Sequence, residues 1–160
     1  PQSGTYVACI NCKRSEQEWF VRKSLEIGMV DAIFENASAD MLDKMAELNN
    51  RLINYDEETE SISRIEIDNE FHQLIYECSG EQLAKNIIKT QMSHYNRIRY
   101  LAELNKSISV KTNDEHNMLI EAIRNKDKRM YLRVIKAHIS RIFNELDKLK
   151  GIYPEYFEKN

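Results

Sequence analysis

Apolar residues recur at every third or fourth position through most of this chain, which is the period of an amphipathic α-helix. The period holds from about residue 15 to residue 150 and is interrupted by short polar or glycine-containing stretches. Only 4 glycines and 2 prolines occur among 160 residues, too few for the many turns of an all-β fold. The pattern predicts six helices, at about residues 15–36, 38–53, 59–78, 81–104, 113–124 and 127–150.

Residues typical of helix ends mark most of these boundaries. Ser15 followed by Glu18 has the form of a capping box, and Gly151 followed by Pro154 favours the end of the last helix. Other expected boundary residues are a helix end at Gly80 and helix starts at Ser38, at Asn113 or Asp114, and at Asp127. Short connections imply antiparallel neighbours, so we expect an all-α antiparallel bundle of six to seven helices.

The two ends of the chain do not follow the helical pattern. A turn signal at residues 3–4 precedes a β-prone run at residues 5–7, which predicts a short N-terminal β remnant. We therefore divide the chain into an N-terminal remnant and linker (residues 1–14), a helical domain (residues 15–150) and a C-terminal tail (residues 151–160). The tail carries three aromatic residues that dock on the bundle or on a partner: Tyr153, Tyr156 and Phe157.

Composition narrows the class of protein. The formal net charge of −3 gives no general attraction to nucleic acid or to an anionic membrane. No apolar run approaches the roughly 20 residues of a membrane span, and we expect no secretory leader. The three cysteines, including a Cys9-x-x-Cys12 pair without a second pair, do not form a disulfide framework. We expect a cytoplasmic protein that does not contact membranes.

The chemistry of the chain centres on Asp68 and His72. These residues are four apart on a predicted helix, so their side chains lie on one face, one turn apart. Phe71 and Ile75 indicate that this face looks into the core. An aspartate directed into a core is costly unless its charge is compensated, and a bound metal ion with His72 as a second ligand would compensate it.

Two further histidines fall on apolar faces of the last two predicted helices. His116 lies 9 residues before Asn125 in the connecting turn, and His138 lies 13 residues after it. At about 1.5 Å rise per residue, these positions are roughly 14 and 20 Å from the turn, so both histidines face inward at similar heights. Each histidine alone is more often a core residue with a hydrogen bond, but the four residues together also fit a metal site.

Three imidazoles and one carboxylate suit zinc best, and nickel, manganese and iron are also possible. His94, at the edge of another apolar stripe, is a structural or pocket-lining candidate. Two alternatives remain at this point. A helical metalloenzyme lacks support, because no Glu-x-x-His motif and no adjacent His-Asp pair occur, and no general base or nucleophile stands out. A metal-free helical interaction module is the second alternative.

The chain contains an Asp-x-x-x-His motif, then a lone histidine, and then a further histidine 22 residues after that one. With this pattern it resembles the FCD domain, the all-helical effector-binding domain of FadR-type regulators in the GntR family. The stretch at residues 71–75, Phe-His-Gln-Leu-Ile, is similar to that around the family's first metal histidine. Residues 114–127 match the family pattern of an acidic residue, His, an apolar pair, Ala-Ile and a basic turn ending in Asp, and residues 137–139 match its last ligand position. Residues 79–82 depart from the family's common Asn-Pro, which affects only the local turn.

The resemblance implies a metal held by Asp68, His72, His116 and His138, with a small organic acid completing the metal's coordination shell. An arginine on the first helix often binds that acid, and Arg22 matches its position. Further ligand-binding candidates are His94, Arg97 and Arg99.

Residues 1–8 resemble the tip and last strand of the wing in GntR-type winged helices. The family resemblance therefore implies a non-enzymatic sensor that controls DNA binding by an N-terminal winged helix absent from this chain. We expect that the chain alone does not bind DNA. We also expect a homodimer, because winged-helix regulators commonly read two-fold sites.

Overall fold

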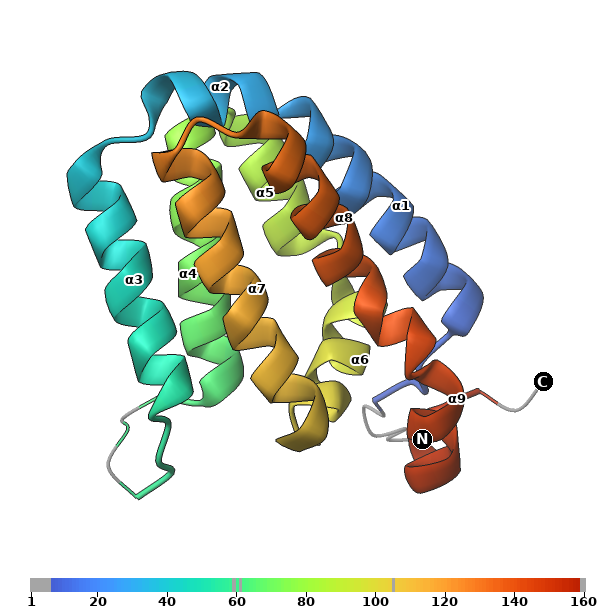
Figure 1. Ribbon diagram of the computed structural model, residues 1–160. Helices are drawn as coiled ribbons and strands as arrows, with labels where there is room; N and C mark the ends of the chain where they lie inside the picture. The colour runs from blue at the N-terminus through green and yellow to red at the C-terminus, as the bar shows by residue number, and fades with distance from the viewer. Residues whose placement is uncertain (1–6, 59, 61, 105, 159–160) are drawn as a thin grey trace, which may run out of the picture.

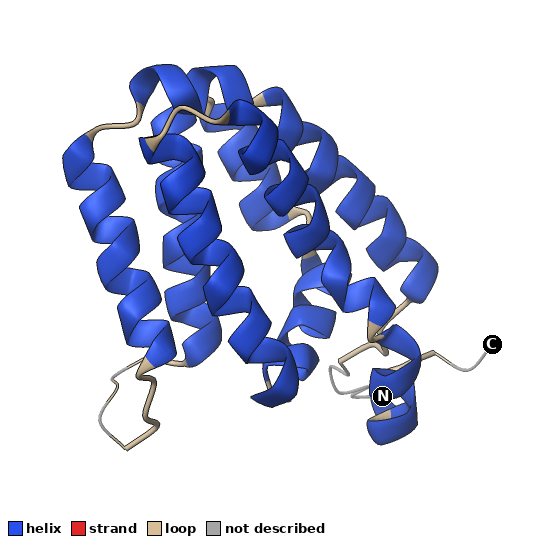
Figure 2. Cartoon of the chain, viewed as in Figure 1, coloured by secondary structure: helices blue, strands red, loops and turns tan. Residues whose placement is uncertain are grey.

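The computed structural model describes residues 7–58, 60, 62–104 and 106–158, apart from the side chains of residues 106–110. Helices account for nearly all of the regular structure in these residues, and no strand is drawn among them (Figure 2). The elements are α1 Cys12–Gly28, α2 Val30–Asn36, α3 Ala39–Ile53, α4 Arg64–Ser79, α5 Gln82–Thr90, α6 Ser93–Glu103, α7 Lys106–Arg124, α8 Lys128–Asn144, α9 Leu146–Ile152 and the 3-10 helix η1 Pro154–Tyr156. The expected all-α bundle is confirmed.

In the part of the chain that the structure describes, the six predicted helices correspond to nine α-helices, because three of them are divided. The first bends after Gly28, where Met29 separates α1 from α2. The fourth breaks at residues 91–92, between α5 and α6, and the sixth breaks at Glu145, between α8 and α9. At the second break the backbone N–H of Tyr95 donates to a carboxylate oxygen of Glu18 in α1, at 2.8 Å. A side chain distant in sequence thus satisfies an amide group that the break leaves without an intrahelical partner.

Three predicted helix starts are wrong. The third helix, expected from about residue 59, begins at Arg64 after its cap Ser63. The first helix begins three residues before Ser15, because Asn11 is its cap and accepts from the backbone N–H of Arg14 at 2.8 Å. Ser15 is buried inside α1. The fifth helix begins at Lys106 rather than at Asn113 or Asp114, so residues 106–112, expected to connect the fourth and fifth helices, are helical. The side chain of Asn113 does not compete for the hydrogen bonds of its own helix backbone, because its oxygen accepts a hydrogen bond from Arg64 at 2.8 Å.

Three other predicted boundary residues lie where they were expected. Ser38 accepts from the backbone N–H of Met41, Gly80 ends α4 with a φ of 71°, and Asp127 caps α8. The last helix passes Gly151 and ends one residue later, at Ile152. Short, well-capped connections of this kind hold successive helices antiparallel.

The bundle places α7 between α3 and α8, and α3 also packs against α4 (Figure 1). Helix α1 packs against α6 and α8. The core contains large side chains that are almost fully buried: Ile33, Met45, Phe71, Tyr95, Ile98, Leu119 and Tyr131. Among the described residues, no helix is both long and apolar enough to cross a bilayer.

The predicted N-terminal β remnant has only one feature in the described residues. Residues 1–6 lie outside the description, and Ile10 forms an isolated parallel bridge with Phe157 of the tail. The backbone N–H of Ile10 donates to Tyr156 at 2.7 Å, and that of Glu158 donates to Ile10 at 3.0 Å. Phe157 is buried, so this part of the tail docks on its own bundle.

Candidate metal centre and effector cavity

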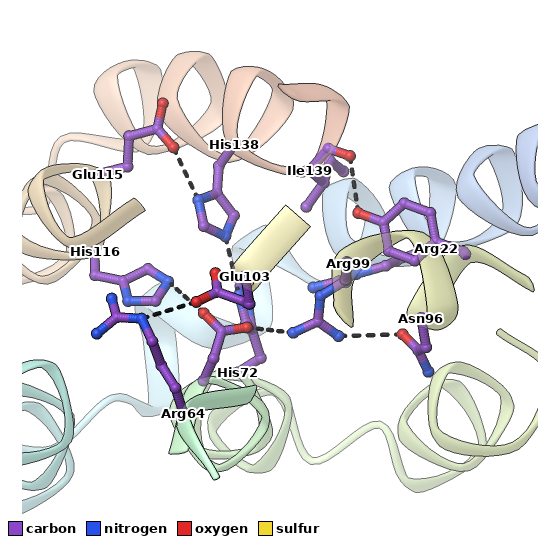
Figure 3. Close-up of polar contacts among 12 residues, drawn as sticks. Arg22, Arg64, His72, Asn96, Arg99, Glu103, Glu115, His116, His138 and Ile139 are labelled. Carbon is purple, nitrogen blue, oxygen red and sulfur yellow. Dashed lines mark hydrogen bonds and ion pairs between the residues drawn. The ribbon is translucent and has the colours of Figure 1, made fainter. Parts of the chain in front are cut away.

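Three histidines from three helices converge inside the bundle. His72 lies on α4, His116 on α7 and His138 on α8, and one potential ligand atom from each lies within 4.8 Å of the others. The Nε2 atoms of His72 and His138 are 3.0 Å apart. Figure 3 shows the ring of His138 joined to His72 by a dashed line, with the ring of His116 close by. Two nitrogens each about 2.1 Å from one zinc ion are roughly 3.0–3.4 Å apart, so this separation fits a shared ion.

Asp68 lies beside this cluster, one turn before His72 on α4. Its Oδ1 is 3.4 Å from Nε2 of His116, and its Oδ2 accepts from the guanidinium of Arg99. Burial by itself would raise the pKa of Asp68, but the charge of Arg99, aided by His116, outweighs burial and holds that pKa below its usual value. Asp68 is therefore an anionic oxygen ligand that Arg99 keeps in place.

Hydrogen bonds on the far side of two imidazoles fix their orientation. Nδ1 of His138 is 2.9 Å from a carboxylate oxygen of Glu115, on the side away from His72 (Figure 3). Nδ1 of His116 is 3.2 Å from the side-chain oxygen of Asn49. Both partners are acceptors, so the ring proton belongs on Nδ1 and the Nε2 lone pair faces the cluster.

Asn49 presents its oxygen to His116 because its amide nitrogen is used elsewhere. That nitrogen donates to the backbone oxygen of Asn113 at 3.0 Å and to the side-chain oxygen of Asn117 at 2.8 Å. The ring of His116 also stacks on Phe71, with centroids 3.9 Å apart. The position of this imidazole is thus set from two directions.

Burial keeps the three histidines of the cluster, His72, His116 and His138, neutral at physiological pH, because it lowers the pKa of each. Desolvation by burial lowers the pKa of His116 to about 3 and that of His138 to about 4. Burial, followed by the charge of Arg22, also lowers the pKa of His72 well below its usual value. Nε2 of His116, which faces the cluster, is buried and has no hydrogen-bond partner among the described residues. Neutral imidazoles with unsatisfied nitrogens are the form that binds a metal ion, so the donor set fits a divalent metal.

A cavity of about 180 Å³ adjoins the cluster. Its lining brings together His72 of α4, Arg22 of α1 and Arg99 of α6, and also includes Asn69, Gln73, Tyr76, Lys85, Ile88, Lys89 and Asn96. A second, smaller cavity of about 40 Å³ touches Asp68 and His138 and is also lined by Arg22 and Arg99. The two arginines therefore line both cavities next to the cluster.

Arg22 is almost fully buried and is held by a charged and a polar partner. Its Nε donates to Glu26 at 2.6 Å, and its Nη2 donates to the hydroxyl of Tyr76 at 3.1 Å. That hydroxyl in turn donates to the same oxygen of Glu26 at 2.6 Å. The guanidinium also lies 5.2 Å from the ring centroid of Tyr95. This network fixes the guanidinium at the cavity wall and gives Arg22 a structural role as well.

His94 and Arg97, two other candidates from the sequence, lie apart from this cavity lining. Nδ1 of His94 accepts from the backbone N–H of Asn11 at 3.0 Å. Arg97 donates to the backbone oxygen of Ala8 at 2.6 Å and lines a separate surface groove. Both residues hold the segment before α1 against α6.

Several residues around the site were not identified from the sequence. Glu115 precedes His116 directly, and an acidic residue beside a candidate ligand is a weak signal that could have indicated it. Asn49 and Glu26 reach the site from α3 and α1, and their sequence positions give no such signal. Tyr76 lies on α4, one turn after His72, and this spacing could have indicated it.

Comparisons with known proteins agree with this architecture. The model of the FCD domain family matches residues 19–141. The chain is 21% identical, over 159 residues, to an uncharacterized HTH-type transcriptional regulator in an unstable DNA locus of Streptomyces ambofaciens. The match covers 98% of this chain and 66% of that relative, so the chain spans just under two thirds of the relative's length.

The structure of E. coli McbR/YncC has the same fold, with a TM-score of 0.75 at 20% identity. The alignment covers 96% of this chain and 76% of that one. Because the FCD model covers most of the chain, the resemblance inferred from the histidine and aspartate motifs is confirmed, and a regulatory, non-enzymatic family excludes the metalloenzyme alternative. The chain belongs to the FCD domain family of transcriptional regulators.

Proposed function

We propose that this domain is a metal-dependent sensor of a small carboxylic acid within a longer, cytoplasmic and homodimeric GntR-type regulator. The observation that carries the proposal is the position of three neutral, buried imidazoles and Asp68 beside a cavity lined by Arg22 and Arg99. Metal ligands and guanidinium groups on one small cavity favour an anion that contacts both.

His72, His116, His138 and Asp68 would hold the ion, zinc in the first instance, with nickel, manganese and iron compatible with the same donors. When bound, the ion supplies a concentrated positive charge and open coordination positions for a carboxylate oxygen. Arg22 and Arg99 add fixed hydrogen-bond donors, and their burial makes the charge of the cavity more effective than it would be in water.

Helix α6 connects this cavity to the segment that precedes the bundle. Arg99 contacts Asp68, while Arg97 and His94 on the same helix hold Ala8 and Asn11. A ligand that favours one position of α6 would therefore shift residues 8–11, and with them the DNA-binding winged helix of the longer regulator. The coupling free energy between the cavity and residues 8–11 cannot exceed the difference between the ligand's binding free energies for the two positions of α6.

Short carboxylic acids should stabilise the domain only when it carries metal. At an acid concentration of 100 times Kd, we expect a stabilisation of about 2.7 kcal/mol, or a rise in Tm of about 5–10 °C. The measurement compares thermal unfolding of metal-loaded and chelator-stripped protein. Hydrogen exchange at the Asn11 amide in the same samples should change only when acid and metal are both present. Equal stabilisation of stripped protein would show that the metal is structural and would reject the proposed sensing mechanism.

A further inference from the structure

The larger cavity is lined by cations at both of its sides. Arg22 and Arg99 lie on the side of the histidine cluster, and Lys85 and Lys89 come from α5. No carboxylate contributes to the described lining. Lys85 and Lys89 are four residues apart on one helix, so their ammonium groups belong to one face, one turn apart.

The protein neutralises these cations unequally. Arg22 is paired with Glu26, and Arg99 is paired with Asp68. Lys85 is 2.7 Å from Glu77, whose side chain is 39% exposed, so solvent weakens this pair. Lys89 has no charged partner among the described residues, and it lines the cavity next to Ile88. Positive charge therefore remains uncompensated on the α5 side, away from the inner arginines.

The size of the cavity restricts its occupant. A volume of about 180 Å³ is smaller than a typical drug-sized pocket. Ile88 and the ring of Tyr76 give the lining an apolar part. A short carbon chain fits this space, whereas a long acyl chain does not.

We propose that the ligand is a short acid with two anionic groups, and that Lys85 and Lys89 bind the group distant from the metal centre. This inference rests on the proposed function, which supplies the first carboxylate site at the metal. It assigns selectivity between dicarboxylates and monocarboxylates to α5. Together, a divalent ion and the four cationic side chains exceed the negative charge of the three carboxylates paired with them by three positive charges. A dianion therefore balances the charge of the cavity better than a monoanion does.

The test uses two matched pairs of acids on the metal-loaded protein: succinate with butyrate, and glutarate with valerate. Within each pair, only the distal carboxylate differs. Titration calorimetry should show at least one dicarboxylate binding roughly tenfold more tightly than its monocarboxylate partner, with the difference decreasing at high salt. Changing both Lys85→Met and Lys89→Met should abolish this difference and leave the monocarboxylate affinity within about twofold of its original value.

Two further variants act as controls. Lys136→Met removes an exposed lysine of α8 and should not alter either affinity. Glu77→Gln releases Lys85 from its ion pair and should strengthen dicarboxylate binding roughly 1.5- to 5-fold.

The outcomes separate this inference from the proposed function. Metal-dependent binding of monocarboxylates with no preference for either dicarboxylate would reject the role of α5 and retain the sensor. If the double lysine variant lost affinity for the dicarboxylate and for its monocarboxylate partner to the same extent, the role of α5 would also be rejected. Failure of all four acids to bind metal-loaded protein would overturn both proposals.

Discussion

Replacing His116 or His138 with alanine should remove nearly all bound metal. Each change deletes a nitrogen ligand from a cluster in which the three histidines lie within 4.8 Å of one another. Mutation of residues that only orient metal ligands typically lowers affinity 10- to 100-fold, so loss of a ligand should lower it by at least about 100-fold. Metal analysis after dialysis against a weak chelator would measure this as a fall from about one ion per chain to a trace.

His94→Ala is the matched control, because His94 bonds to Asn11 outside the cluster and should leave metal content unchanged. Each variant also needs comparison with its own metal-stripped form, since removing the fully buried His116 leaves a cavity that destabilises the fold independently of metal. Full metal occupancy in both His116→Ala and His138→Ala would contradict the assignment.

Arg22→Ala should lower the free energy of unfolding by about 3–5 kcal/mol. The change leaves the carboxylate of Glu26 buried, with one of its oxygens already lacking a hydrogen-bond partner among the described residues. Among the described residues, Tyr76 would remain the one hydrogen-bond partner of that carboxylate. Urea denaturation of metal-stripped protein measures this effect without a contribution from the ion.

The double change Arg22→Met and Glu26→Gln should recover most of that loss, because it removes both charges and retains similar volumes. A double variant as unstable as Arg22→Ala would show that packing around Arg22, rather than the buried charge of Glu26, is the main term. Arg22→Ala alone is thus a poor test of acid binding, since the same change disturbs the fold.

The sequence predicted the helical regions more reliably than their interruptions. Apolar periodicity and local caps such as Ser38 and Asp127 depend on residues close in sequence, and they are found where expected. The break between α5 and α6 depends instead on Glu18, which lies 77 residues from the amide that it caps. No glycine or proline marks that break, so periodicity alone predicts one long helix.

The same distinction applies to the site. The convergence of the histidines was predictable because Asp68 and His72 share a helix face, and the short turn near Asn125 places His116 opposite His138. The orienting contact from Asn49 and the Arg22–Glu26–Tyr76 network join helices whose packing the sequence does not specify. Arg97 and His94 follow the periodicity of α6, but their side chains contact residues 8–11 and not the cavity. Which of the two they contact depends on the tertiary structure.

Nuclear magnetic resonance of ring-¹⁵N histidine in the protein, before and after addition of one equivalent of zinc, tests the metal centre most directly. Because Glu115 and Asn49 accept at the Nδ1 positions of His138 and His116, zinc should bind Nε2 there and leave the proton on Nδ1. We expect three of the four histidines to shift to the Nε2-bound form, while His94 remains unchanged. Four unperturbed imidazoles at saturating zinc would contradict the proposed metal centre.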